Sequence, residues 1–132
     1  MKRYVLDSYA LIAYFNGLES GKPVIDILKK TVDGGAETFM SVLNFGELYY
    51  ITLREDGSAK AESCLKLLSQ YPIEIVDIQK YLTLEAAKIK ADGKMCYINA
   101  FTAALVKYKK AELVTGDKEF KALEKNTHIT WI

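Results

Sequence analysis

The hydrophobic positions of the chain form short apolar runs that alternate with longer segments of helical spacing. Short runs rich in β-branched and aromatic residues predict buried strands, and five are expected, at residues 3–7, 37–42, 73–78, 112–117 and 128–132. The longer segments predict amphipathic helices, at residues 8–17, 22–35, 41–56, 58–71, 79–93, 97–111 and 118–126. This alternation is typical of a parallel sheet covered by helices on both faces. With 132 residues, the chain is expected to form a single α/β domain over residues 1–132.

Two helix boundaries depend on capping signals. Ser58 is the expected N-cap of the segment 58–71, which Pro72 ends, because serine hydroxyls accept hydrogen bonds from the first turn of a helix. Asn99, near the start of the segment 97–111, has the same capacity as a cap.

Composition and charge narrow the function classes. The chain is 50% hydrophobic and 27% charged, which is ordinary for a soluble domain, and its net charge is only +1. A polyanion would therefore be held by a local patch or by metal ions rather than by overall charge. Two isolated cysteines, Cys64 and Cys96, do not form a disulfide framework or a zinc site, and buried free thiols are expected. The first residues do not resemble a signal peptide, and no stretch is long enough for a membrane span, so a cytoplasmic location is expected.

Acidic residues follow two of the predicted strands. Asp7 comes directly after "YVL", and Asp117 comes after "LVTG". The carboxyl ends of parallel strands lie at one edge of the sheet, where sites form in open α/β folds. The alternative interpretation is that each aspartate only caps the next helix.

Two further polar residues lie on apolar helices. Glu47 has Leu43 and Ile51 one turn away on either side, which predicts a buried carboxylate that needs a cation or hydrogen-bond donors. Pairing with a lysine or arginine is the alternative role. Asn99 lies beside the apolar face of its helix; as a metal ligand it would offer one neutral carbonyl oxygen, weaker than a carboxylate for Mg²⁺ or Mn²⁺.

Other chemistry is sparse in the sequence. His128 has no serine or cysteine partner and is expected to be structural or exposed, and no glycine-rich phosphate loop is present. The basic segment 107–110 and the lysines Lys118, Lys121 and Lys125 are expected to be solvated. Because they flank the strand at 112–117, a phosphate-facing role is the alternative.

Four stretches, in order and spacing, resemble the motifs of PIN-domain nucleases, and especially the VapC-type toxins of bacterial and archaeal toxin–antitoxin pairs. They are "YVLDSYALIAYF", "SVLNFGELYY", "YINAFTAALV" and "LVTGDKEFKAL", and the resemblance covers Tyr4 to Ile132. It implies a three-layer α/β/α sandwich around a central parallel sheet. It also implies a Mg²⁺- or Mn²⁺-dependent endoribonuclease that leaves a 5′-phosphate and a 3′-hydroxyl. The expected partners are RNA, a VapB-like antitoxin and a second copy in a homodimer.

The resemblance also assigns roles to individual residues. Asp7 would be the main metal ligand with Ser8 beside it, Glu47 the acid of the second motif, and Asp117 the ligand of the fourth motif. Thr115 and Glu119 would support the site.

The third motif departs from the family pattern. The family usually has "YxDAxxAA", and this chain has "YINAFTAA", with Asn99 in place of the metal-binding aspartate. The loss of one negative charge predicts weaker metal binding and reduced or abolished cleavage. Asn99 is either a natural residue of an attenuated enzyme or an introduced change. The alternative functions are a silent PIN domain that binds RNA or protein, and a Rossmann-like module that binds a small molecule without metal.

Overall fold

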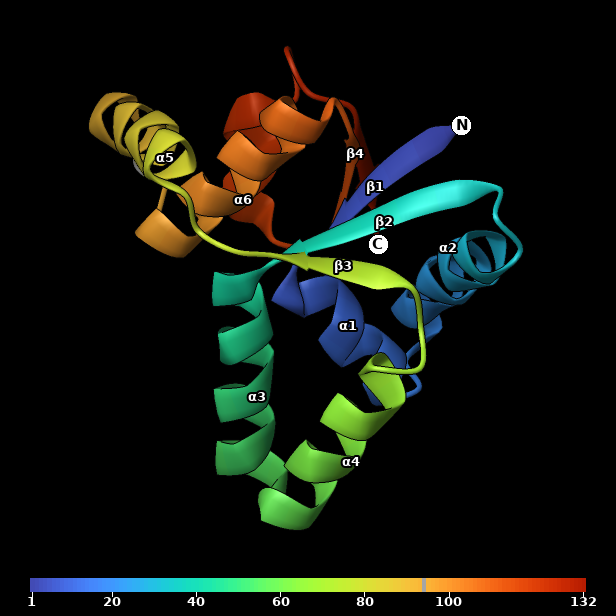
Figure 1. Cartoon of the computed structure of the whole chain (residues 1–132). Helices are drawn as coiled ribbons and strands as arrows, with labels where there is room; N and C mark the ends of the chain where they lie inside the picture. The colour runs from blue at the N-terminus through green and yellow to red at the C-terminus, as the bar shows by residue number, and fades with distance from the viewer. Residues whose placement is uncertain (94) are drawn as a thin grey trace.

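The computed structural model describes residues 1–93 and 95–132 and has a five-stranded, fully parallel sheet at its centre (Figure 1). The strands are β1 (Lys2–Leu6), β2 (Ala36–Ser41), β3 (Ile73–Val76), β4 (Glu112–Thr115) and β5 (Ile129–Trp131). They lie in the order β3-β2-β1-β4-β5. The strand order therefore reverses between β1 and β4, which places a switch point there.

Helices cover both faces of this sheet, as the sequence predicts. They are α1 (Ser8–Phe15), α2 (Lys22–Val32), α3 (Val42–Asp56), α4 (Ser58–Leu68), α5 (Lys80–Asp92) and α6 (Tyr97–Lys109), with short 3₁₀ helices at Glu19–Gly21 and Lys118–Leu123. One face of the sheet packs against α1 to α4, and the other against α5, α6 and the second 3₁₀ helix (Figure 1). Along β1, Tyr4 and Leu6 belong to the first core and Val5 to the second, as the two-residue period of a strand requires. The α/β/α sandwich is confirmed.

Several helix ends differ from the sequence-based expectations. The N-cap of α4 is Gly57, with φ +89° and no side-chain hydrogen bond, so the expectation for Ser58 is wrong. The N-cap of α6 is Cys96, again without a side-chain bond, which leaves the Asn99 side chain free for other contacts. The last predicted helix is a 3₁₀ segment only, because so short a stretch gains little from helical hydrogen bonding. Cys64 is buried as expected, whereas Cys96 is exposed.

The end of α6 has an unusual residue in a left-handed conformation. Lys110 has φ +51° and ψ +48°, and the N–H of Ala111 donates to the carbonyl of Val106 at 3.0 Å. This is a Schellman-type helix end, in which glycine normally takes the left-handed position because a Cβ atom is disfavoured there. The lysine side chain is therefore kept at a position that favours glycine.

We expect the Lys110→Gly substitution to raise the free energy of unfolding by about 1 kcal/mol, since it relieves the left-handed strain without removing a packed side chain. Urea denaturation of both proteins measures the difference. An equal or lower stability of the variant would show that the lysine side chain contributes contacts that offset the strain.

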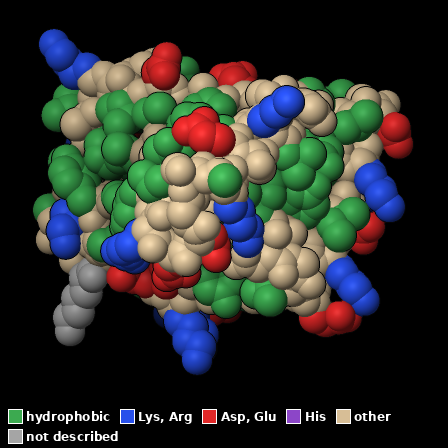
Figure 2. All heavy atoms as spheres, turned by 90° about the horizontal axis from the view of Figure 1, so that it is seen from below, with side chains coloured by type: hydrophobic (Ala, Val, Ile, Leu, Met, Phe, Trp, Pro, Cys, Tyr) green, Lys and Arg blue, Asp and Glu red, His purple; other side chains and the backbone are tan. Residues whose placement is uncertain are grey.

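The α3–α4 hairpin extends away from the sheet and exposes apolar side chains. Tyr50, Leu53 and Leu67 are 47%, 39% and 38% exposed. Figure 2 views the molecule from below this end and shows hydrophobic side chains interspersed with charged ones. Among the residues described, no helix has the length and apolarity needed to cross a membrane.

Candidate active site

The switch point between β1 and β4 brings together residues that are 108 positions apart in the sequence. Asp7 follows β1, Thr115 ends β4, and the Thr115 hydroxyl donates to the Asp7 carboxylate. The backbone N–H of Asp117 in turn donates to Thr115 Oγ1 at 3.0 Å. The carboxyl ends of the strands therefore fix the first and fourth motifs against each other.

Asp7 is a buried carboxyl group in an unfavourable electrostatic environment. Its residue is 2% exposed, and it caps α1 by accepting a 2.9 Å bond from the N–H of Ala10. Burial raises the pKa of Asp7 from 3.8 to about 7, the bonds from Thr115 and Ala10 lower it in part, and the negative charges of Asp117 and Glu47 raise it further. A cation at this position would relieve both the burial and the repulsion.

Glu47 reaches the same region from α3. The Ser8 hydroxyl donates to Glu47 Oε1, and Asn44 Nδ2 donates to the same atom at 3.3 Å. Glu47 is only half-buried, so the expectation of a buried carboxylate is wrong in part. The buried residues of α3 are Asn44, Leu48 and Thr52. Within the described part of the chain no lysine or arginine pairs with Glu47.

Asn99 connects two acids of the fourth motif. From its buried position in the first turn of α6, its Nδ2 atom donates to Asp117 Oδ2 at 3.0 Å and to Glu119 Oε1 at 3.0 Å. Glu119 Oε1 also accepts the backbone N–H of Cys96 at 2.5 Å, and Asp117 caps the following 3₁₀ helix through the N–H of Glu119. The amide thus supplies hydrogen-bond donors where an aspartate would add a third negative charge.

Asn44 and Thr102, which the sequence interpretation missed, form a hydrogen-bonded chain to Glu47. Asn44 is fully buried; its Oδ1 atom accepts from Thr102 Oγ1 at 2.6 Å, and its N–H donates to Ser41 Oγ at 3.1 Å. The signal was visible as polar residues, Asn44 and Thr102, within two apolar helices, because buried polar groups require partners. Together they connect α3 to α6 behind the acidic side chains.

Replacement of Thr102 by valine is expected to lower the free energy of unfolding by about 1–2 kcal/mol, because the Asn44 carbonyl loses a buried donor. Thermal denaturation measures the change. Thr83→Val on α5, which removes only an exposed hydroxyl bonded to the backbone of Gln79, is the matched control and should have little effect. Equal effects of the two substitutions would contradict the role of the Asn44–Thr102 contact.

The donor atoms of this cluster have the chemistry of a magnesium or manganese site. The polar groups are carboxylate oxygens of Asp7, Glu47, Asp117 and Glu119 with hydroxyls of Ser8 and Thr115, and hard divalent cations prefer such oxygens. Over residues 1–93 and 95–132, however, no group of three or more Asp, Glu, His or Cys side chains lies close enough to hold one ion together. The donor atoms are therefore of the kind that bind a divalent cation. In this structure the Asn99 amide, rather than a cation, contacts Asp117 and Glu119.

Other candidate residues lie outside the cluster. His128 Nδ1 is 3.4 Å from Glu112 Oε1 on the surface of the β4–β5 edge, consistent with a structural or exposed role. Residues 107–110 precede β4 and therefore lie toward its amino end, away from the end that carries Asp117. Desolvation raises the pKa of both thiols, even though Cys96 as a whole residue is exposed, so neither thiol favours the thiolate form that a nucleophile requires.

Comparison with known proteins identifies the family. A family model described as PIN domain matches residues 4–126. The chain belongs to the PIN domain family. The matched range contains all four stretches of the PIN domain that carry the clustered acids and Asn99. A search of curated proteins finds no significant match.

Solved structures share the PIN fold over nearly the whole chain. VapBC2 from Rickettsia felis, bound to a DNA fragment from the promoter, is 18% identical with a TM-score of 0.77 and 97% coverage of both chains. DNA-bound VapBC from Salmonella typhimurium is 16% identical with a TM-score of 0.76 and 98% coverage of both. VapC20 from Mycobacterium tuberculosis, described as a Sarcin-Ricin loop cleaving toxin, is 14% identical with a TM-score of 0.68, covering 90% of this chain and 93% of the other.

Proposed function

We propose that the chain is a metal-dependent endoribonuclease of the VapC type, the toxin component of a toxin–antitoxin pair, with activity weakened by Asn99. The observation that carries the proposal is the convergence of Asp7, Glu47, Asn99 and Asp117, from four separate stretches, at the switch point of a PIN fold. The similarity in fold to a toxin described as Sarcin-Ricin loop cleaving supports RNA as the substrate class.

Different residues of the cluster would bind the cation and orient the attacking water. Asp7 and Asp117, with the Asn99 carbonyl, would hold one or two Mg²⁺ or Mn²⁺ ions, and Glu47 would orient an attacking water. A bound divalent ion would supply a Lewis acid that activates water and offsets charge on the scissile phosphate. Thr115 keeps the Asp7 carboxylate in place, and Ser8 does the same for Glu47. This chemistry requires no histidine and no thiol.

The proposed partners are a VapB-like antitoxin and a second copy of the chain, in the cytoplasm. Support comes from the solved VapBC structures of similar fold and from the apolar side chains exposed on the α3–α4 hairpin. A basic side chain of an antitoxin placed among the acids would neutralise them, as a cation does.

Asn99 favours a second candidate, a PIN domain that binds RNA or protein without cutting. Its amide bridges Asp117 and Glu119 and so stabilises the cluster in the absence of a cation. In that case the fold and the acids would be kept while the chemistry is lost.

Cleavage of labelled RNA in the presence of Mn²⁺ tests the proposal. We expect EDTA-sensitive internal cuts whose products carry 5′-phosphate and 3′-hydroxyl ends, and loss of these cuts in the Glu47→Gln variant. The contrary result is RNA that stays intact with both the unaltered chain and Asn99→Asp, under conditions where Asn99→Asp binds Mn²⁺. It would contradict nuclease activity and favour a PIN domain that binds without cutting.

A further inference from the structure

The face of the molecule formed by α5, α6 and the C-terminal segment has a groove that begins beside the acidic cluster. A hollow of about 360 Å³ is bordered by Glu119 of the cluster together with Ile89, Asp92 and Leu123. The same last three residues border a second hollow of about 600 Å³, which extends along α6 to the amino end of β4. The two hollows therefore adjoin along these three residues, and we call them together the α6 groove.

Positive charge increases along the α6 groove with distance from the cluster. The described residues of the wall at the cluster end include the acids Glu119 and Asp92 and no lysine or arginine, whereas the far hollow combines Asp92 with Lys107 and Lys110. Both lysines are exposed, and in the described part of the chain neither forms an ion pair. At a rise of about 1.5 Å per residue, Lys107 lies about 12 Å along α6 from Asn99. Two free ammonium groups thus lie within reach of a polymer that extends from the cluster.

Further basic groups continue the groove beyond Lys110. A third hollow of about 270 Å³ shares Lys110 and His128 with the far hollow and adds Lys2 and Arg3. Lys2 pairs with Glu112 at 3.7 Å and Arg3 pairs with Glu37 at 3.6 Å, whereas Lys110 forms no ion pair with a described residue. Lys2, Arg3 and Lys110 still outnumber Glu112 among the residues that line this hollow. The far end of the groove is therefore complementary to an anionic polymer.

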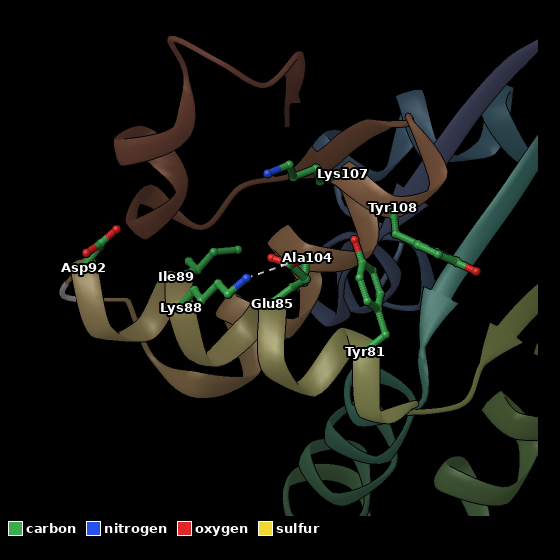
Figure 3. Close-up of a pocket in the computed structure, with 8 residues that line it drawn as sticks. All are labelled: Tyr81, Glu85, Lys88, Ile89, Asp92, Ala104, Lys107 and Tyr108. Atoms are coloured by element: carbon green, nitrogen blue, oxygen red, sulfur yellow. Dashed lines mark ion pairs between the residues drawn. The ribbon is translucent and has the colours of Figure 1, made fainter.

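An aromatic pair lies beside the same lysine. Lys107 also borders a hollow of about 410 Å³ that is lined by Tyr81 and Tyr108, whose ring centroids are 5.9 Å apart (Figure 3). Figure 3 shows the Tyr81 ring beside this hollow and Lys107 extending across its upper side, while Lys88 points toward Glu85 instead. Tyr81 is 56% exposed. The Tyr108 ring already has Lys109 Nζ at 5.6 Å from its centroid, so Tyr81 is the ring of this pair that is open to a ligand. Exposed aromatic rings next to free cations are typical of single-stranded nucleic-acid surfaces and are not needed for an acidic peptide.

We propose that the α6 groove binds single-stranded RNA next to the cluster, with phosphates at Lys107 and Lys110 and a base stacked on Tyr81. This surface rests on the proposed function, because RNA is the substrate inferred there.

Fluorescence anisotropy with a short labelled single-stranded RNA, measured in EDTA, tests the groove without cleavage. We expect the Lys107→Gln/Lys110→Gly double variant to bind the RNA about tenfold more weakly. The slope of log binding constant against log salt concentration should become shallower by about 1.4, since two phosphate contacts are lost. Lys29→Gln/Lys30→Gln, which removes two exposed lysines from the last turn of α2, is the matched control and should keep the affinity. Because Lys110→Gly relieves backbone strain, the double variant is expected to fold.

A second variant tests the stacking contact. Tyr81→Leu should weaken RNA binding about fivefold or more, and Tyr50→Leu on α3 should not. If the Lys107/Lys110 and Lys29/Lys30 double variants lost RNA affinity equally, RNA binding in the α6 groove would be contradicted. A dimer that dissociates in the Lys107/Lys110 variant while RNA affinity is unchanged would also contradict it, because the groove would then be a contact between copies. Since no outcome depends on cleavage, failure of the nuclease and failure of the groove are separate results.

Discussion

In the presence of Mn²⁺, the Asn99→Asp variant is expected to cleave RNA at least about 100-fold faster than the unaltered chain. The substitution adds a carboxylate where Asn99 Nδ2 now donates to Asp117 and Glu119 at 3.0 Å. An added negative charge would tighten cation binding and strengthen the activation of water. Initial rates with a fluorogenic RNA, with and without EDTA, measure the effect.

The same variant should be less stable without metal. It loses both amide hydrogen bonds and places three carboxylates together, which we expect to lower the free energy of unfolding by about 2 kcal/mol. Added Mn²⁺ should restore the stability, because ligands that bind only the folded state stabilise it. Asn16→Asp, which makes the same change at the exposed end of α1, is the control for both measurements. Equal rates for Asn99→Asp and the unaltered chain would show that Asn99 is not part of the reacting centre.

The metal-free chain should lose stability as the pH rises from about 4 to about 7. Burial raises the pKa of Asp7 from 3.8 to about 7, so over this interval the unfolded chain releases the Asp7 proton while the folded chain keeps it. Ionisation therefore favours the unfolded state, by up to about 4 kcal/mol, and the effect stays constant above the folded pKa. Asp7→Asn removes this dependence, keeps an oxygen that can cap α1, and should be the more stable protein at pH 7.5.

Urea denaturation in EDTA at pH 4.5 and 7.5 measures this difference between Asp7→Asn and the unaltered chain. Asp26→Asn, at an exposed position of α2, controls for the loss of one acid and should keep the pH dependence of the unaltered chain. In the Asn99→Asp background, Asp7→Asn should also abolish cleavage. A variant that is less stable than the unaltered chain at pH 7.5 would contradict the assignment of Asp7 as a carboxyl kept for function at the expense of stability.

The sequence predicts the layers and the strand ends because these follow from local patterns. Alternating apolar runs and amphipathic segments set the order of elements, and parallel strands necessarily bring Asp7 and Asp117 to one edge. The inward face of α3 could not be predicted in the same way. Its apolar residues surround the helix, so periodicity does not show that Asn44 and Leu48, rather than Glu47, are the fully buried positions.

Long-range contacts explain the remaining differences. The donation of Asn99 to Asp117 and Glu119 depends on how α6 packs beside the loop after β4, and no local signal indicates it. The expected cap at Ser58 failed because the positive φ of Gly57 already turns the chain between α3 and α4. The position of residues 107–110, by contrast, follows from the order of elements alone, because a segment that precedes β4 lies toward the amino end of that strand.

Titration of Mn²⁺ by calorimetry tests most directly whether Asp7, Glu47, Asn99 and Asp117 form one cation-dependent centre. We predict saturable binding by the unaltered chain, tighter binding by Asn99→Asp by about 10- to 100-fold, and loss of binding in the Asp7→Asn/Asp117→Asn double variant. Equal binding by all three proteins, or no saturable binding by Asn99→Asp, would contradict the existence of this centre.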